Sequence, residues 1–389
     1  MFCCSANQRI SLGLLRWRFL AACSNNLQDS SLLILKSFST SHCASTKKEV
    51  SKALKQWTLV VNPFGKVRVQ LQCNISVRPL DPHAFPEANR AFITIHGTSA
   101  DQAVQLDSFQ VHYDDQNKEL YILSEVRNSN VSVELTAPIK SDLYITTQGE
   151  GNVHVQKMEG DNCRVQTERG NCVLHSVKGH QVQVQSQGGN VTGVGTIHGN
   201  VDISTSGHST STCFAVNVKK IQGTTMNVST EHGSLKVKAI YAESTSISSS
   251  SGRIQLGHIH GDATVRNETG DIFVDGSNNG FLKVLSNSGN IDAYVGDSGS
   301  AELHSQQGAV SVRVPSSIRA GVQLCGTSVE TSPEIVLHQA ERDSKDGMTT
   351  VTGHMNGQPQ GDQWIRAQAD RGSITLKAQS WFESLKLGS

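Results

Sequence analysis

The sequence predicts an all-β protein: a parallel β-solenoid with about 19 residues and two strands per coil, a β-rich N-terminal region and a C-terminal cap. Three observations predict it. Short alternating strands follow glycines at a fixed spacing. Of the 34 glycines, 25 fall between residues 149 and 326, where this spacing holds. Few aromatic (5%) and charged (17%) residues are also typical of β-structure with many turns.

Each predicted coil begins with a glycine, which is followed by a small or polar residue and an alternating strand. Steps of 18 or 19 residues, such as that from Gly151 to Gly170, recur along the repeat, except between Gly189 and Gly233. That longer step is interpreted as two coils lengthened around residues 204–213. Alternation indicates a strand with one buried face, and the regular step is too short for a βαβ unit or a propeller blade. The predicted turn positions are Gly151, Gly170, Gly189, Gly233, Gly252, Gly270, Gly289 and Gly308.

Like residues of neighbouring coils should stack about 4.8 Å apart. Glycine can supply a positive φ at the corners, and an Asn or Asp after it can form a ladder with its neighbours. A β-sandwich of short hairpins is the architectural alternative. The expected interior row is Val153, Cys172, Val191, Leu235, Ile254, Ile272, Ile291 and Val310.

Outside the repeat, the flanks are also β-rich. We expect a strand at residues 90–96 and a hairpin at residues 109–123, which turns at residues 114–117. Residues 372–376 repeat the solenoid motif. The expected segments are a transit peptide and disordered N-terminal segment (1–48), a β-rich region (49–138), the solenoid (139–330) and a loop-rich cap ending in a strand (331–389).

The N-terminal segment carries three arginines and no acidic residue before Asp29. This composition is typical of a mitochondrial transit peptide, and the residues around Lys36 predict cleavage between Phe38 and Ser39. Secretion and a disordered tail are the alternatives, although Arg16 and Arg18 interrupt the apolar stretch that a secretory signal needs. That stretch is also too short for a spanning helix, so no membrane span is expected.

Cysteines and glycosylation motifs favour opposite compartments. Five of the nine cysteines lie beyond the N-terminal segment, an odd number without a Cys-x-x-Cys motif, which favours a reducing compartment. The N-x-S/T motifs would instead fit secretion, although chance motifs are expected in such a sequence. They begin at Asn74, Asn130, Asn190, Asn227 and Asn267.

Charge and motifs exclude several activities. The 34 basic residues balance the 34 acidic ones, which argues against a dedicated nucleic-acid binder. Serine-hydrolase, phosphate-loop and calcium-repeat motifs are absent. Acids such as Asp262 and Asp271 follow turn glycines, and His258 and His260 are interpreted as surface residues. We therefore expect no catalytic residue, no metal and no cofactor.

A family resemblance adds to this interpretation. Residues 131–138 (VSVELTAP), residues 143–147 (LYITT) and the Gly-Asn-Val repeats resemble the adhesin-type β-solenoid domain of bacterial and eukaryotic proteins. Residues 312–315 and 321–324 resemble the way such domains close. The whole chain, with its presequence-like start, is similar to a vertebrate protein of this architecture. The resemblance implies a fold and a label of adhesion, without catalytic residues.

The sequence therefore predicts a non-enzymatic β-solenoid scaffold or binding protein in the mitochondrial matrix, with an unidentified protein partner. One alternative is a secreted or surface adhesin that binds glycans. The other is a polysaccharide-acting β-helix enzyme that would use Asp262 or Asp271. The oligomeric state is not specified. Residues expected to face outward as a binding surface are His154, Gln183, Gln185, Lys236, Lys238 and Gln255.

Overall fold

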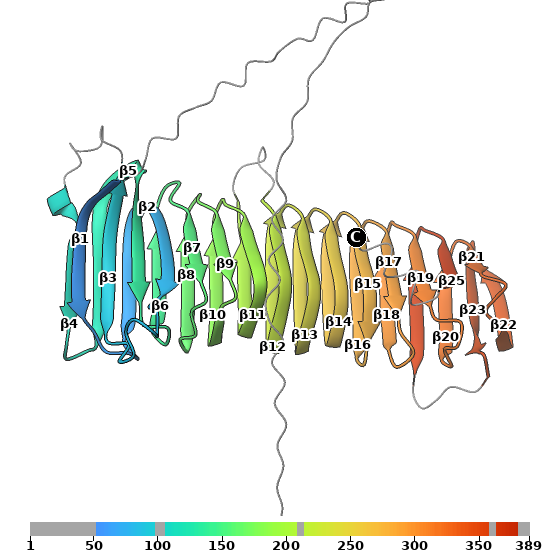
Figure 1. The fold of residues 1–389 in the computed structure, drawn as a ribbon. Coiled ribbons are helices and arrows are strands. Elements are labelled where there is room, and N and C mark those ends of the chain that lie inside the picture. Colours follow the sequence, from blue (N-terminus) through green and yellow to red (C-terminus); the bar gives the residue numbers. More distant parts are fainter. Residues whose placement is uncertain (1–51, 98–105, 208–213, 358–362, 380–389) are drawn as a thin grey trace, which may run out of the picture. The chain divides into compact units, whose positions relative to one another are not determined.

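The protein is described by a computed structural model of residues 52–97, 106–207, 214–357 and 363–379. These residues form 25 strands and one short 3-10 helix, η2 (Leu106–Ser108), within a single compact unit, Glu49–Ser389 (Figure 1). In these ranges no helix is both long and apolar enough to cross a membrane. The predicted cleavage between Phe38 and Ser39 lies outside the described residues, and the domain boundaries at 138 and 330 stay predictions.

Parallel coils of two strands each make up the middle of this unit, as the sequence predicts. Val153 pairs with Cys172, and the same register continues coil by coil to Val310. Each residue of the expected interior row is at most 1% exposed, which confirms that row. The separate first strands are β7 (Val153–Gln156), β9 (Cys172–His175), β15 (Ile272–Asn278), β17 (Ile291–Val295) and β19 (Val310–Val314).

The second strands stack in the same way and form the other face of the solenoid. Their inward residues, such as Val165, Val184 and Ile203, are fully buried, so apolar side chains from both faces fill the interior. The separate second strands are β6 (Asp142–Thr147), β8 (Asn162–Thr167), β10 (Lys178–Ser186), β16 (Phe281–Ser288) and β18 (Ser300–Ser305).

In four consecutive coils the first and second strands join without a break. These long strands are β11 (Val191–Thr205), β12 (Val216–His232), β13 (Leu235–Ser251) and β14 (Ile254–Thr269). Where they cross the corner, a third interior row of fully buried isoleucines forms. This row consists of Ile197, Ile221, Ile240 and Ile259. Val191 pairs with Val216, and Val216 with Leu235, so the extra residues of the longer glycine step all lie between β11 and β12.

The N-terminal end does not follow chain order. The second strand of the chain pairs in parallel with β5 on one side and with β6 and β7 on the other, so later residues form the outer coil. The expected strand at 90–96 and the hairpin at 109–123 are confirmed as β3 and β4–β5. The strands are β1 (Lys52–Val60), β2 (Lys66–Pro79), β3 (Arg90–Gly97), β4 (Gln110–Asp114) and β5 (Glu119–Ala137).

The C-terminal end shows the same departure from chain order. The last two strands, β24 (Trp364–Ala369) and β25 (Ile374–Ala378), form a coil. This coil inserts between β18–β19 and the earlier strands β20 (Gly321–Gly326) and β21 (Val329–Thr331). We call it the inserted coil.

The expectation of a loop-rich cap at residues 331–389 was wrong in part. An antiparallel hairpin forms there, from β22 (Leu337–Lys345) and β23 (Met348–Met355), and β23 pairs with β20. The sequence hid β22 because nearly every residue in it is exposed, so no alternation of buried and exposed positions marks the strand. Its charged residues also make a poor template for edge-to-edge pairing with another chain.

Candidate functional site

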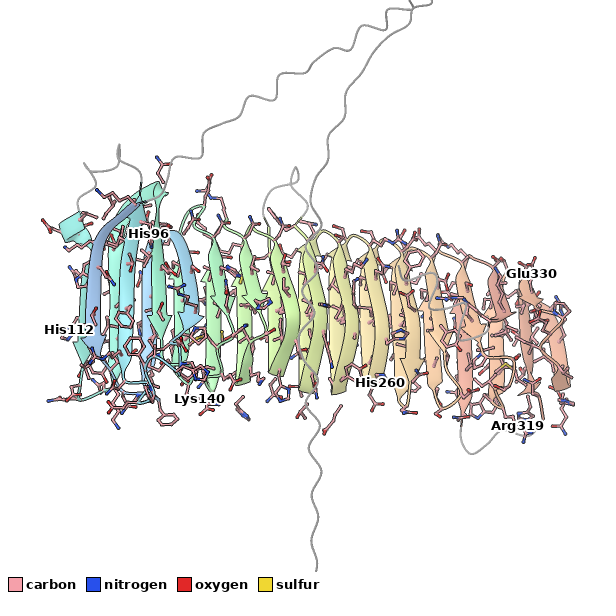
Figure 2. All side chains as sticks on the ribbon, viewed as in Figure 1. His96, His112, Lys140, His260, Arg319 and Glu330 are labelled. Atoms are coloured by element: carbon pink, nitrogen blue, oxygen red, sulfur yellow. The ribbon has the colours of Figure 1, made fainter. Side chains whose placement is uncertain are left out.

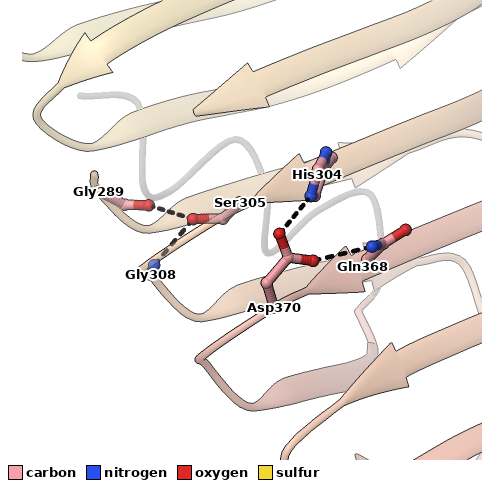
Figure 3. Close-up of polar contacts among 6 residues, drawn as sticks. All are labelled: Gly289, His304, Ser305, Gly308, Gln368 and Asp370. Carbon is pink, nitrogen blue, oxygen red and sulfur yellow. Dashed lines mark hydrogen bonds and ion pairs between the residues drawn. The ribbon is translucent and has the colours of Figure 1, made fainter. Parts of the chain in front are cut away.

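Buried hydroxyl groups close the turns between second and first strands. The Ser186 hydroxyl donates to the carbonyl oxygen of Gly189 (3.0 Å) and accepts from its amide (2.9 Å). Ser305 likewise accepts from the amide of Gly308 and donates to the carbonyl oxygen of Gly289, both at 2.9 Å (Figure 3). Sequence reasoning missed this corner row, because these polar residues occupy positions that alternation assigns to the apolar interior.

The eight predicted turn glycines lie at the closest approach between coils. A methyl group at Gly170 would overlap the carbonyl oxygen of Gly151, and the same holds for every later glycine of the set against the coil before it. A positive φ applies only to Gly233, Gly252 and Gly270 among the eight. Left-handed geometry, which the sequence suggested as the reason for glycine at these positions, therefore matters less than the lack of space for a side chain.

The residues after these glycines form a ladder of amides. The Asn152 side-chain oxygen accepts from the backbone amide of Asn171 (2.8 Å), and Asn171 does the same for Asn190 (3.0 Å). Asn74 and Asn190, which begin two of the predicted glycosylation motifs, belong to this ladder. The side-chain oxygen of each accepts a hydrogen bond from a backbone amide of the next coil. The asparagine of a third motif, Asn267, is buried: it is 3% exposed. Its side-chain amide donates to the carbonyl oxygens of Gly252 and Gly270.

The expected outward residues face outward, but they lie on two different faces. Gln183 and Gln185 belong to second strands, whereas the other four belong to first strands. His258 and His260 lie on the outside of β14, on either side of buried Ile259. His260 is labelled in Figure 2. The His260 ring stacks on Tyr241, with ring centroids 4.6 Å apart.

A polar groove runs across β11–β14 and β16 on the second-strand face, and we call it the serine groove. Its volume is about 750 Å³. Ser204, Ser229 and Ser248 occupy equivalent positions on three consecutive coils, and Arg266 takes this position on the fourth. Two residues farther along the strands, equivalent positions carry Glu231 and Glu268. Of its lining residues only Gln185 was among the expected outward residues, and the serines were missed, although the serine run at 248–251 was a visible signal.

The serine groove holds polar groups without intramolecular partners. Within the described residues, no hydrogen bond or ion pair engages the side chains of Ser229, Ser248 or Arg266, all of which are exposed. Deeper in the groove, the Thr205 hydroxyl and the Asn267 carbonyl oxygen are buried without a partner in this part of the chain. Such atoms can be satisfied by water or by a polar ligand.

The acids considered for catalysis are kept apart. Asp262 begins the second-strand segment of β14 and accepts the backbone amide of Phe281 (2.9 Å). Asp271 precedes a first strand and accepts the amide of Asn290 (2.9 Å). Both carboxylates therefore act in the turns. Among the described residues, no group of three His, Cys, Asp or Glu side chains is placed to hold a metal ion.

Four cysteines lie in the described ranges, and none of these forms a disulfide. Burial raises the pKa of Cys73 and of Cys163 to about 12. Burial also raises the pKa of Cys172, which lies near Cys163. The thiolate is the reactive form, so these three thiols are inert packing groups.

Known proteins resemble this chain in sequence and, weakly, in structure. A candidate adhesin from Parabacteroides merdae is 12% identical, with 66% of this chain and 95% of that chain covered and a TM-score of 0.37. Another from Parabacteroides distasonis is 11% identical, with coverage of 85% and 98% and a TM-score of 0.33. The family named Toastrack DUF4097 matches residues 86–212 and again 200–324, more than half of the chain. The protein therefore belongs to the Toastrack DUF4097 family.

Proposed function

We propose that this protein is a non-enzymatic binding protein whose serine groove takes a linear glycan. The observation that supports this most is the row of Ser204, Ser229 and Ser248, which offers a hydroxyl on three consecutive coils. Coils stack at about 4.8 Å, so the row presents the same donor and acceptor at a short, constant interval. A ligand that uses it must be an extended polymer of similar polar units.

The chemistry of the serine groove favours a glycan over a peptide. An extended peptide binds a β-protein best at a sheet edge, where unpaired backbone groups accept a new strand. The groove instead lies across the face of paired strands, so only side chains are offered. Serine hydroxyls, the Arg266 guanidinium and two carboxylates can donate to or accept from the many hydroxyls of a sugar chain.

The groove is better suited to binding than to hydrolysis. Glycoside hydrolases need one carboxyl in a desolvated environment that raises its pKa, paired with a second carboxylate across the scissile bond. Glu231 and Glu268 are both exposed, and two coil steps separate them. Asp262 and Asp271 are used in the turns. The arrangement therefore supports binding of a polymer that is released without being cleaved.

Affinity electrophoresis of the purified chain through gels containing soluble linear polysaccharides tests this proposal. Ser229→Trp places a large side chain in the groove from an exposed position, so it should restore normal mobility in the gel that retards the wild type. Asn217→Trp, an exposed outward position of the same strand on the other face, is the matched control and should stay retarded. Equal retardation of both variants, or no retardation of the wild type in any gel, would contradict the groove as a glycan site.

A second proposal, an intracellular scaffold imported into mitochondria, is supported by the cysteines and the asparagines. Three buried thiols without disulfides suit a reducing compartment. Glycosylation at Asn267 would require its buried amide to leave two hydrogen bonds. Mass spectrometry of the mature N-terminus tests this location. A start at Ser39 supports import, whereas a start near Ser24 with occupied motifs at Asn130 or Asn227 supports secretion.

A further inference from the structure

Four lysines gather on two neighbouring coils of the first-strand face. Lys219 and Lys220 lie in β12, and Lys236 and Lys238 lie in β13. Val218 pairs with Val237, so Lys219 and Lys238, the next residues, lie side by side at one strand spacing (~4.8 Å). We call these four residues the lysine patch.

The lysine patch is not neutralised by the protein itself. In the described part of the chain, none of its four side chains forms an ion pair. Residues 216–223, 235–242 and 254–260, which form this part of the surface, contain no acid. Farther along the same face, Asp275 lies in β15, where the charges of Arg313 and His258 act on it more strongly than that of Lys236. Glu243 lies farther along β13, beyond Tyr241, so acids occur only around the patch.

Two exposed apolar side chains flank the patch. Val194 is 41% exposed and precedes Lys219 by one coil. Tyr241 is 40% exposed, and the Lys220 ammonium lies 4.7 Å from its ring centroid. His260 covers the other face of that ring, which fixes the orientation of the tyrosine. Tyrosine beside lysine is the combination found at membrane–water interfaces, where the ring enters the headgroup layer and the ammonium meets phosphate.

We propose that the lysine patch attaches this protein to the surface of an anionic phospholipid bilayer. A sheet face presents the four ammonium groups together, and Val194 and Tyr241 add apolar contact at the edge. Charge complementarity identifies the partner, because four uncompensated cations in a chain of zero formal net charge form a local attraction for an anionic surface. The serine groove lies on the second-strand face and stays accessible in the attached protein.

Co-sedimentation of the full-length chain with vesicles tests this proposal. Vesicles of phosphatidylcholine with phosphatidylserine should sediment the wild type, and vesicles of phosphatidylcholine alone should leave it in solution. Lys219→Gln, Lys236→Gln and Lys238→Gln together should weaken partitioning roughly 100-fold, about fivefold for each lysine. The control combines Lys118→Gln, Lys157→Gln and Lys345→Gln, and it should bind as the wild type does. These three lysines are exposed, lie elsewhere on the protein and form no ion pair with any residue that the structure describes.

Three outcomes would overturn the proposal. The first is equal weakening in both triple variants, because net charge alone would then explain binding. The second is equal sedimentation with neutral and anionic vesicles. The third is capture by a soluble polyanion such as heparin without any vesicle binding, because the patch would then recognise a polymer and not a bilayer. Circular dichroism of both variants establishes that they are folded before any comparison.

Discussion

The imidazole Nε2 of His304 lies 3.1 Å from the Oδ2 atom of Asp370, although 66 residues separate them in the chain (Figure 3). His304 belongs to β18, and Asp370 directly follows β24 of the inserted coil. Gln368 donates to the other oxygen of the same carboxylate (2.8 Å). Asp370 thus joins the last coil in sequence to a coil formed much earlier in the chain, on the outer surface of the second-strand face.

This contact predicts a pH dependence of stability. Burial disfavours the charged carboxylate, but hydrogen bonds from Gln368 and His304 outweigh it and hold the pKa of Asp370 below its ordinary value. A lowered folded-state pKa stabilises the fold above the unfolded value of about 3.9 and loses that effect as pH falls through the folded value. The Asp370 side chain is 40% exposed, so the effect should be modest.

Urea unfolding of the wild type and of Asp370→Asn between about pH 6 and about pH 2 measures the contribution of the Asp370 carboxylate to stability. The wild type should be the more stable protein at the upper end, and the difference should shrink as the solution is acidified. A constant difference over the whole range would mean that ionisation of Asp370 does not contribute.

The turn glycines predict a large cost for the smallest possible side chain. Gly170→Ala places a methyl group against the carbonyl oxygen of Gly151, a backbone atom that no side-chain rotation can move. We expect a loss of about 3 kcal/mol in unfolding free energy, at the upper end for overpacking. Gly347→Ala is the control: unlike Gly170, Gly347 has an unfavourable φ (+75°), but nothing lies within 4 Å of an added Cβ. That variant should lose about 1 kcal/mol. Similar losses in denaturant titrations of the two would contradict steric crowding as the reason for Gly170.

Sequence patterns could predict the coils because the local rule repeats. Alternation assigned Val153 and Cys172 to the interior, and the glycine spacing placed them in neighbouring coils. The same patterns could not place β2 or the inserted coil, because alternation tells which side of a strand is buried and not which strand lies beside it. A strand that is apolar on one side fits equally well against several coils of the same repeat.

The serine groove escaped prediction for a related reason. Ser204 and Ser229 are equivalent only when the enlarged coil between β11 and β12 is known, since this step is longer than the regular period of the repeat. The buried polar corner was hidden as well: Ser186 and Ser305 look like ordinary turn residues in the sequence, and their hydrogen bonds to backbone groups appear only in three dimensions.

The asparagine ladder predicts a smaller loss of unfolding free energy than the turn glycines do. Asn171 accepts two hydrogen bonds from Asn190, one from its backbone amide and one from its side chain, at 3.0 and 3.1 Å. Asn171→Ala should lower the unfolding free energy by about 1–2 kcal/mol, because it removes the acceptor that this amide uses. Asn171→Asp keeps the acceptor but loses the bond that the Asn171 side chain donates to Asn152 (3.1 Å), so it should recover only part of this loss at neutral pH. Equal losses for Ala and Asp would show that the accepted bonds are unimportant.

Because the inserted coil lies inside the stack, we predict that its removal damages the solenoid far more than loss of a terminal repeat. β24 is hydrogen-bonded to β18 on one side and β20 on the other, and β25 joins β19 to β21. A chain ending after Asn356 would leave one edge of each of these four partners unpaired and expose the interior beneath the missing coil. The expected result is a large fall in the thermal midpoint followed by circular dichroism, with rapid proteolysis of residues beyond β19. A chain ending after Gln379, which keeps the inserted coil, is the matched control and should melt as the full chain does. Equal midpoints for the two shortened chains would mean that β20 and β21 can pair directly with β18 and β19, and that the inserted coil is dispensable for the fold.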